Sequence, residues 1–330
     1  MNQNIWSLIG FAAVALIVVG GLTFLSQHYT LDNIKSKTVG DGQYGTAHVC
    51  GSVLRSVMAF GGEGLPVSGI TPLWLKAYEG YLLHKGGKGL AWNTVSTYMR
   101  MLQAVYNRAV VRKLAAFIPH QFRDVFTGRK ADHRRVLERD DMQKLLVERD
   151  PDITSPGMAW ARACLELMFR FHGMPFVDLA HLRKSDLKDG YLTLRRRKTG
   201  MPLSARVDGR AMQLLERYRN RDDTSPYLLC FLDGNLEGMA AYRDYQRILR
   251  LLNSRLRVLA LWKKVQGKVT SYSARHTWAT VGRYCHIPIE VISEGLGHAS
   301  VTTTEGYMKG FGNSRMDRAN KVIMNYIFKG

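Results

Sequence analysis

The chain has few acidic residues and few cysteines for its length. Of its 330 residues, 27 are Asp or Glu against 47 Lys or Arg, which gives a formal net charge of +20. This excess favours a polyanionic partner, nucleic acid first and an anionic membrane surface second, over small neutral metabolites. The four cysteines stand far apart and match no CxxC or Cys/His metal-binding spacing. Their spacing argues against a zinc module and a disulfide-stapled secreted domain, and favours a reduced cytosolic setting.

Signatures of several enzyme classes are also missing. The sequence has no HExxH, no GxxxxGK[ST] and no GxGxxG that opens a helix. A zinc protease, a P-loop NTPase and a dinucleotide enzyme would each need one of these motifs, so we expect neither a metal nor a cofactor. With 46% hydrophobic and 22% charged residues, the chain can bury a core, and its length favours two folded modules.

The first 46 residues differ from the rest in composition. The run Ile5–Leu25 contains no charged residue, and its length is sufficient to span a bilayer as a helix. Lys35 and Lys37 follow it, so the positive-inside rule predicts a cytoplasmic remainder anchored to the inner membrane. A buried core helix is the alternative interpretation. Charges within residues 1–46 cancel, so the whole excess of +20 belongs to residues 47–330.

Residues 47–126 are predicted to form a helical module. Residues 47–60 carry apolar side chains at helical spacing, and Thr71 followed by Pro72 signals the start of a second helix. A third helix is predicted over residues 92–114. Its apolar face consists of Trp92, Val95, Met99, Leu102, Val105 and Ala109. The rest of its surface carries residue types that suit base and phosphate contacts, although a merely solvated face is the alternative. The candidate DNA-binding residues on this helix are Asn93, Thr97 and Arg100.

The remainder of the chain is predicted to be a linker and a second module. Residues 127–137 are basic and lack apolar periodicity, which indicates an interdomain linker able to lie along a phosphate backbone. Residues 138–330 are mostly helical in pattern, with two short strands forming a hairpin around KTGMP. The expected fold class is therefore mainly α with a small β-hairpin or sheet, preceded by an N-terminal hydrophobic helix.

Three short stretches of the second module carry residues suited to chemistry. RRRKTG places four adjacent basic residues, Arg196 and Lys198 among them, at the end of a strand. SYSARHTWAT places Arg275 near the start of a helix, and LGHASVTTTEGYMKG places His298 nine residues before Tyr307. Each stretch taken alone has an ordinary structural interpretation, because hairpin lysines are usually solvent-exposed and single tyrosines are usually structural.

Taken in order, these stretches resemble the catalytic domain of tyrosine recombinases, the phage and transposon integrases. The pattern LGH-x5-T-x2-Y follows ARHTWAT and a KTG hairpin, as in that family. FHGMPFVDLAHLRKSDL, RRRKTG and NTVSTYMRMLQAVYNRAV are similar to integrases of Bacteroides-type mobile elements. The resemblance covers residues 47–330 and implies a SAM-like core-binding domain followed by a mixed, mostly helical catalytic domain. Residues 1–46 instead resemble the N-terminus of conjugative coupling proteins.

The resemblance implies DNA integration and recombination through a 3′-phosphotyrosyl intermediate, without metal or ATP. In that family Tyr307 would be the nucleophile, and Arg275 and His298 would bind the scissile phosphate. Lys198 would protonate the leaving 5′ oxygen. Arg196, in the run of basic residues that ends with Lys198, is a further candidate DNA-binding residue. The partner would be double-stranded DNA at specific sites, held by a homotetramer on paired sites.

Two positions depart from the family pattern. Tyr272 stands where the family usually has His, three residues before Arg275. The family's first catalytic arginine follows a Gly–hydrophobe pair, where this chain has Pro175, and close relatives often carry Arg at the position of His172. Tyr272 and His172 are therefore secondary catalytic candidates. Because one lost oxyanion-type donor costs about 10²–10³ in rate, a catalytically impaired, DNA-binding accessory protein of a mobile element stays open as an alternative. The run Ile5–Leu25 keeps a second alternative open, a membrane component of a conjugation apparatus.

Overall fold

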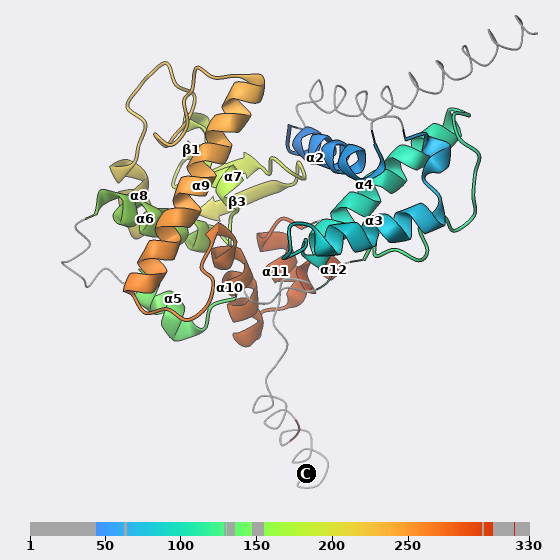
Figure 1. The fold of residues 1–330 in the computed structure, drawn as a ribbon. Helices are drawn as coiled ribbons and strands as arrows, with labels where there is room; N and C mark the ends of the chain where they lie inside the picture. The colour runs from blue at the N-terminus through green and yellow to red at the C-terminus, as the bar shows by residue number, and fades with distance from the viewer. Residues whose placement is uncertain are drawn as a thin grey trace, which may run out of the picture. The chain divides into compact units, whose positions relative to one another are not determined.

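The computed structural model describes residues 44–62, 65–128, 130, 136–146, 155–298, 300–305 and 320. The chain divides into two compact units, Met1–Lys130 and Ala131–Gly330, and this division falls inside the predicted linker (Figure 1). The run Ile5–Leu25 and Tyr307 lie outside the described residues. Of the helices that the structure describes, none combines the length and apolar character needed to cross a bilayer.

The first unit is built from helices around one apolar core. Its elements are α2 (Tyr44–Gly61), the 3₁₀ turn η1 (Val67–Gly69), α3 (Pro72–His84) and α4 (Trp92–Val111). The predicted start of α3 is confirmed, because Thr71 Oγ1 accepts a hydrogen bond from the Trp74 backbone nitrogen at 3.2 Å and Pro72 occupies the first turn. The core takes residues from all three α-helices and from the segment that follows α4.

Helix α4 buries most of the apolar face predicted for it. Val95, Met99, Leu102, Val105 and Ala109 are all buried. Trp92, predicted on the same face, is instead 37% exposed, because it begins the helix at the edge of the core. Its ring packs edge-on against Phe126 and carries the Lys130 ammonium 4.2 Å from its centroid.

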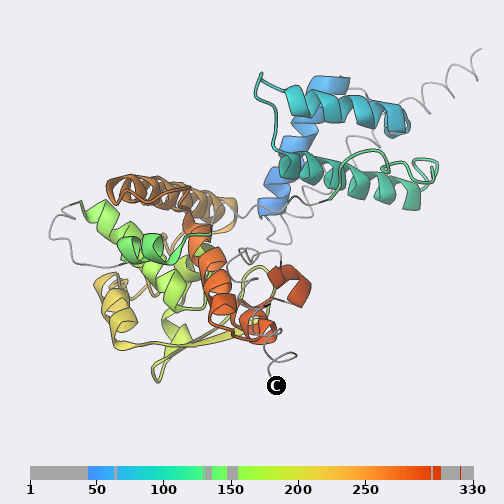
Figure 2. The same cartoon turned by 90° about the horizontal axis from the view of Figure 1, so that it is seen from below.

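The second unit is mostly helical, as predicted. In chain order its elements are α5 (Arg139–Leu146), α6 (Pro156–Arg170), α7 (Phe176–Ala180), the 3₁₀ turn η2 (Lys184–Asp186), β1 (Leu187–Lys188), β2 (Tyr191–Arg195), β3 (Pro202–Arg206), α8 (Gly209–Arg217), α9 (Gly238–Trp262), α10 (Ser271–Tyr284), α11 (Ile289–Gly295) and α12 (Val301–Glu305). Helix α6 is central: every residue from 161 to 168 is buried, and it packs against α5, α8, α9 and α10. The turned view shows α10 beside α9 and α11 (Figure 2).

The sheet of this unit has three antiparallel strands in the order β1-β2-β3. The predicted hairpin is β2 and β3, paired from Tyr191 opposite Arg206 to Arg195 opposite Pro202. Strand β1 adds a third, two-residue strand that is too short to show a sequence pattern. The tight turn between β2 and β3 is closed by the Gly200 nitrogen donating to the Arg196 carbonyl at 2.8 Å, with Gly200 at φ +69°. This turn carries Lys198.

Candidate active site

Arg275 is the centre of the candidate site. Its side chain, on the second turn of α10, is almost fully buried. Nη1 donates to the Gly173 carbonyl at 3.0 Å, and Nη2 donates to the Leu296 carbonyl at 2.7 Å and lies 2.7 Å from His298 Nε2. One guanidinium thus joins the turn after α6, the end of α11 and the loop that carries His298.

Gly173 allows this close approach of backbone to α10. A Cβ at this position would lie 2.9 Å from the Arg275 Cα, and the residue has φ +66°. Both observations require glycine, since a side chain would clash with helix backbone and would also be strained in the left-handed region. The Gly-hydrophobe pair in the family pattern therefore has a structural cause here: it brings a carbonyl to Arg275.

His298 is held as a neutral ring. A guanidinium can only donate, so Nε2 accepts from Arg275 and the ring proton lies on Nδ1. Nδ1 then donates to Thr304 Oγ1 at 2.8 Å. Burial, together with the positive charges of Arg275, Arg196 and Lys198, lowers the pKa of His298 to about 3. The ring is consequently uncharged near neutral pH.

The hairpin contributes two basic side chains with different surroundings. Lys198 is exposed on the turn between β2 and β3, and its charge acts on His298. Arg196, predicted to contact DNA, is 5% exposed and forms an ion pair with Asp178 on α7 (Nε to Oδ2, 2.7 Å). Arg196 Nη1 also donates to the Leu296 carbonyl, the acceptor that Arg275 uses. Arg196 thus lies in the floor of the site with Arg275.

The two secondary candidates lie in different cavities. Tyr272 is 40% exposed on the first turn of α10 and lines, with Pro175 and Tyr245, a cavity of about 210 Å³. His172 lines another cavity of about 390 Å³, and its ring centroid is 5.6 Å from that of Trp278. Burial lowers the pKa of His172, so the ring carries no charge near neutral pH. Tyr272 therefore lies beside the position of the missing arginine, whereas His172 does not line that cavity.

The DNA-binding candidates of α4 divide into two kinds. Asn93 uses both ends of its amide within the unit: Nδ2 donates to the Lys130 carbonyl and Oδ1 accepts from the Lys130 nitrogen, each at 2.8 Å. Thr97 Oγ1 donates to the Asn93 carbonyl at 2.8 Å, one turn back along the helix. Arg100 is exposed. In this conformation Arg100 is the member of the set whose charge faces solvent.

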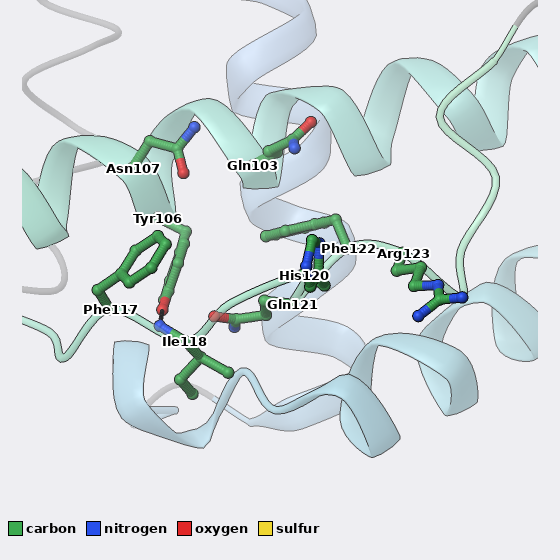
Figure 3. A pocket seen from close by; sticks show the side chains of 9 residues that line it. All are labelled: Gln103, Tyr106, Asn107, Phe117, Ile118, His120, Gln121, Phe122 and Arg123. Atoms are coloured by element: carbon green, nitrogen blue, oxygen red, sulfur yellow. Dashed lines mark hydrogen bonds between the residues drawn. The ribbon is translucent and has the colours of Figure 1, made fainter.

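A hollow of about 420 Å³ in the first unit carries no comparable chemistry. It lies between α4 and residues 117–123 (Figure 3). Tyr106 crosses it, donating its hydroxyl to the Ala116 carbonyl at 2.7 Å and accepting from the Ile118 nitrogen at 2.9 Å. Neither a carboxylate nor a cysteine is among its lining residues. Throughout the described ranges, no cluster of three or more His, Cys, Asp or Glu side chains could hold a metal ion.

Several groups in the site were not identified by sequence reasoning. Asp178 is the single acidic residue in the mostly apolar stretch FVDLAHL, and that isolated charge was a usable signal. Thr304 belongs to the LGH-x5-T-x2-Y pattern, although no role was assigned to it. The carbonyls of Gly173 and Leu296 have no sequence signal at all, because every residue has a carbonyl and only the fold decides which ones converge.

Comparison with known proteins shows the family to which the chain belongs. The model of the phage integrase SAM-like domain matches residues 24–123, and that of the phage integrase family matches residues 135–311. Tyrosine recombinase XerA of Pyrococcus furiosus is 29% identical over 140 residues, which are 42% of this chain and 46% of XerA. The chain therefore matches less than half of that relative. The putative integrase/recombinase y4gC of Sinorhizobium fredii is 27% identical over 180 residues, 53% of this chain and 88% of that protein.

Solved structures show the same fold. A lambda integrase fragment, in a dimer bound to a COC′ core site, superposes with a TM-score of 0.61 at 17% identity, covering 87% of this chain and 96% of that one. XerH recombinase bound to its palindromic difH substrate, in a post-cleavage complex, gives 0.58 at 17% identity, covering 78% and 71%. Because the family model covers more than half of the chain and the SAM-like model precedes it, the chain belongs to the phage integrase family of tyrosine recombinases, with a SAM-like core-binding domain and a catalytic domain.

Proposed function

We propose that this protein is a site-specific recombinase that cuts and rejoins double-stranded DNA through a 3′-phosphotyrosyl intermediate on Tyr307. The observation that carries the proposal is the hydrogen-bonded pair of buried Arg275 and half-buried His298 beside the hairpin of Lys198. This arrangement concentrates hydrogen-bond donors and positive charge without a metal, which suits a phosphodiester whose non-bridging oxygens gain charge in the transition state.

In the proposed reaction the Tyr307 oxygen attacks the phosphorus and the bond to the 5′ oxygen breaks. The phenol gives its proton to water, and Lys198 gives a proton to the leaving 5′ oxygen, so the products are a 3′-phosphotyrosyl link and a 5′-hydroxyl. An ordinary tyrosine has a pKa of about 10, so the positive site must favour loss of the phenol proton. The phosphotyrosyl bond preserves the energy of the broken bond, and attack by a 5′-hydroxyl of another strand reverses the step without ATP.

His298 can serve the phosphate after a change of hydrogen-bond partners. In the structure Nε2 accepts a hydrogen bond from Arg275 Nη2. If Arg275 Nη2 instead donates to a phosphate oxygen, Nε2 loses that hydrogen bond. Thr304 can donate as well as accept, because a hydroxyl does both. If Thr304 donates to Nδ1, the ring proton moves to Nε2 and can bind the phosphate. The Thr304 hydroxyl therefore allows His298 to change from acceptor to donor while both ring nitrogens remain hydrogen-bonded.

We further propose that four copies act on two paired DNA sites of a Bacteroides-type mobile element. The lambda integrase tetramer bound to a Holliday junction has this fold at a TM-score of 0.55, and recombination must join two duplexes. In the core-binding domain, Arg100 supplies an exposed charge on α4 for the DNA backbone. The net charge of +20 supports such an extended contact and a DNA-associated location in the cytoplasm.

A nicked suicide duplex tests the proposed function. The full chain is used to select its binding site from a random-sequence pool, and the selected site is nicked beside the scissile position so that religation fails. We expect a covalent adduct that survives denaturation and forms in EDTA without nucleotide. The 5′-labelled cleaved strand should be in the adduct, and the released strand should carry a 5′-hydroxyl that polynucleotide kinase can label. Tight binding without any adduct would favour the accessory DNA-binding role instead.

Replacing Lys198 with Ala is expected to slow cleavage by about 10²-fold, since the leaving 5′ oxygen loses its proton donor. Sulfur in place of that bridging oxygen should restore the rate, because a thiolate leaves without needing a proton. Lys188→Ala, an exposed lysine in β1 of the same sheet, is the matched control and should cleave both duplexes normally. Equal slowing of Lys198→Ala on the oxygen and sulfur duplexes would show that Lys198 has another role.

The neutral state of His298 makes stability depend on pH. In the unfolded chain the His298 ring binds a proton as the pH falls through 6.5, whereas in the folded chain it binds one only near pH 3. The stabilisation is therefore complete above 6.5 and is lost progressively below it. The free energy of unfolding is measured in urea at about pH 7 and about pH 5. Between these two pH values it should fall less for His298→Gln than for the wild type. His286→Asn, at an exposed left-handed position of the same unit, should keep the wild-type loss; if it behaves like His298→Gln, the assignment is wrong.

A further inference from the structure

The candidate site lacks one guanidinium that its reaction needs. Charge develops on two non-bridging oxygens of the scissile phosphate, and Arg275 is one donor for them. At the position of the family's other arginine, this chain has Pro175, which is the N-cap residue of α7. The proline ring offers no hydrogen-bond donor. The following inference rests on the proposed function and concerns which residue supplies the second guanidinium.

Two nearby basic side chains are unsuited to this role. His172 is neutral, because burial lowers its pKa, and it packs toward Trp278 in a cavity that Pro175 does not line. Arg170 is held by two carboxylates, with Nε 2.9 Å from Glu166 and Nη1 2.6 Å from Asp208. Moving Arg170 to a phosphate would break both ion pairs and leave the buried Glu166 with fewer partners.

Arg196 lies beside Arg275. Its Nη1 and the Nη2 of Arg275 donate to the same Leu296 carbonyl, so the two nitrogens are within about 6 Å of each other. That separation lets two oxygens of one phosphate bind to both residues at once. Arg196 and Arg275 are both almost fully buried, with exposed fractions of 5% and 3%.

Asp178 fixes the orientation of Arg196, and one guanidinium nitrogen of Arg196, Nη2, is left for a further hydrogen bond. Asp178 Oδ2 accepts from Arg196 Nε at 2.7 Å, and Oδ1 accepts from the Arg197 nitrogen at 2.9 Å, which ties the hairpin to α7. Asp178 is three residues after Pro175, and its own nitrogen donates to the Pro175 carbonyl at 3.0 Å. Within the part of the chain that the structure describes, Nη2 of Arg196 has no hydrogen-bond partner and is not among the buried orphan atoms.

We propose that Arg196 is a catalytic residue that binds the scissile phosphate through Nη2, in place of the arginine that Pro175 displaces, and that Asp178 positions it. The second guanidinium thus comes from the hairpin instead of the start of α7. A phosphate on Arg196 and Arg275 would also lie beside His298 and the turn of Lys198.

A neutral substrate distinguishes catalysis from structural support. Cleavage is measured with the full chain on two nicked duplexes, one with a normal scissile phosphate and one with a methylphosphonate, which carries no negative charge. Arg196→Ala should cleave the phosphodiester about 10²–10³-fold more slowly. On the methylphosphonate the defect should shrink to less than about tenfold, because no anion needs neutralising. Arg196→Lys, which keeps a charge for Asp178 but lacks the fork, should show the same relief with a smaller initial defect.

Arg197→Ala is the matched control, since Arg197 is the exposed neighbour on the same turn. It should cleave both duplexes at near the wild-type rates. The proposal would be overturned if each variant, Arg196→Ala and Arg196→Lys, were slowed equally on the phosphodiester and the methylphosphonate. Arg196 would then be only a structural link between the hairpin and α7. If Arg196→Ala melts before the wild type, the comparison uses Arg196→Lys alone. Failure of the wild type to form any adduct would instead refute the proposed function.

Discussion

Tyr307→Phe is expected to form no covalent adduct on a nicked duplex, while binding that duplex with unchanged affinity. Phenylalanine keeps the ring and removes the oxygen that attacks phosphorus, so the chemical step has no nucleophile. Tyr307 lies outside the described residues, and its assignment rests on its place in the LGH-x5-T-x2-Y pattern after His298. The adduct is measured on denaturing gels, and affinity by mobility shift on an intact duplex.

Tyr326→Phe is the control, because Tyr326 is the next tyrosine along the chain. It should form adduct at the wild-type rate. Proteolysis of the wild-type adduct and sequencing of the DNA-linked peptide should identify residue 307. An adduct that persists in Tyr307→Phe and disappears in Tyr326→Phe would show that Tyr326 is the nucleophile and that the assignment from the LGH-x5-T-x2-Y pattern is wrong.

Arg275→Lys is expected to slow cleavage by about 10³-fold. The guanidinium donates at once to the Gly173 and Leu296 carbonyls and to His298, and a single ammonium cannot reproduce that fork. The substitution therefore removes a phosphate donor and also releases His298. It also leaves buried carbonyls without partners, which we expect to lower the free energy of unfolding by about 2 kcal/mol.

Single-turnover cleavage at saturating protein separates the loss of catalysis from the loss of folded protein. Under these conditions all DNA is bound by folded protein, so the measured rate constant is that of the folded molecules. Arg283→Lys, a half-buried arginine two turns further along α10, is the control and should cleave within about threefold of the wild type. Cleavage by Arg275→Lys within about tenfold of the wild type would show that Arg275 has a packing role and that the phosphate lies elsewhere.

The order of the elements could be predicted from the sequence because their signals are local. The Thr71–Pro72 start of α3, the apolar stripe of α4 and the hairpin around KTGMP each depend on neighbouring residues and their periodicity. The family resemblance likewise depends on short motifs in a fixed order, and these motifs predict Arg275, His298, Lys198 and Tyr307 as site residues. Strand β1 was missed, since two residues are too few to form a pattern.

Only the tertiary structure decided how these residues serve one another. Arg196 and Asn93 are both predicted to contact DNA from their residue type. That prediction does not reveal that Arg196 also pairs with Asp178, or that Asn93 also bonds the backbone of Lys130. The neutral state of His298 follows from its burial and from the three positive charges gathered around it. Such effects depend on atoms that are far apart in the chain, so residue identities determined which chemistry was available, and the packing of α10 against Gly173 and Leu296 decided where that chemistry meets.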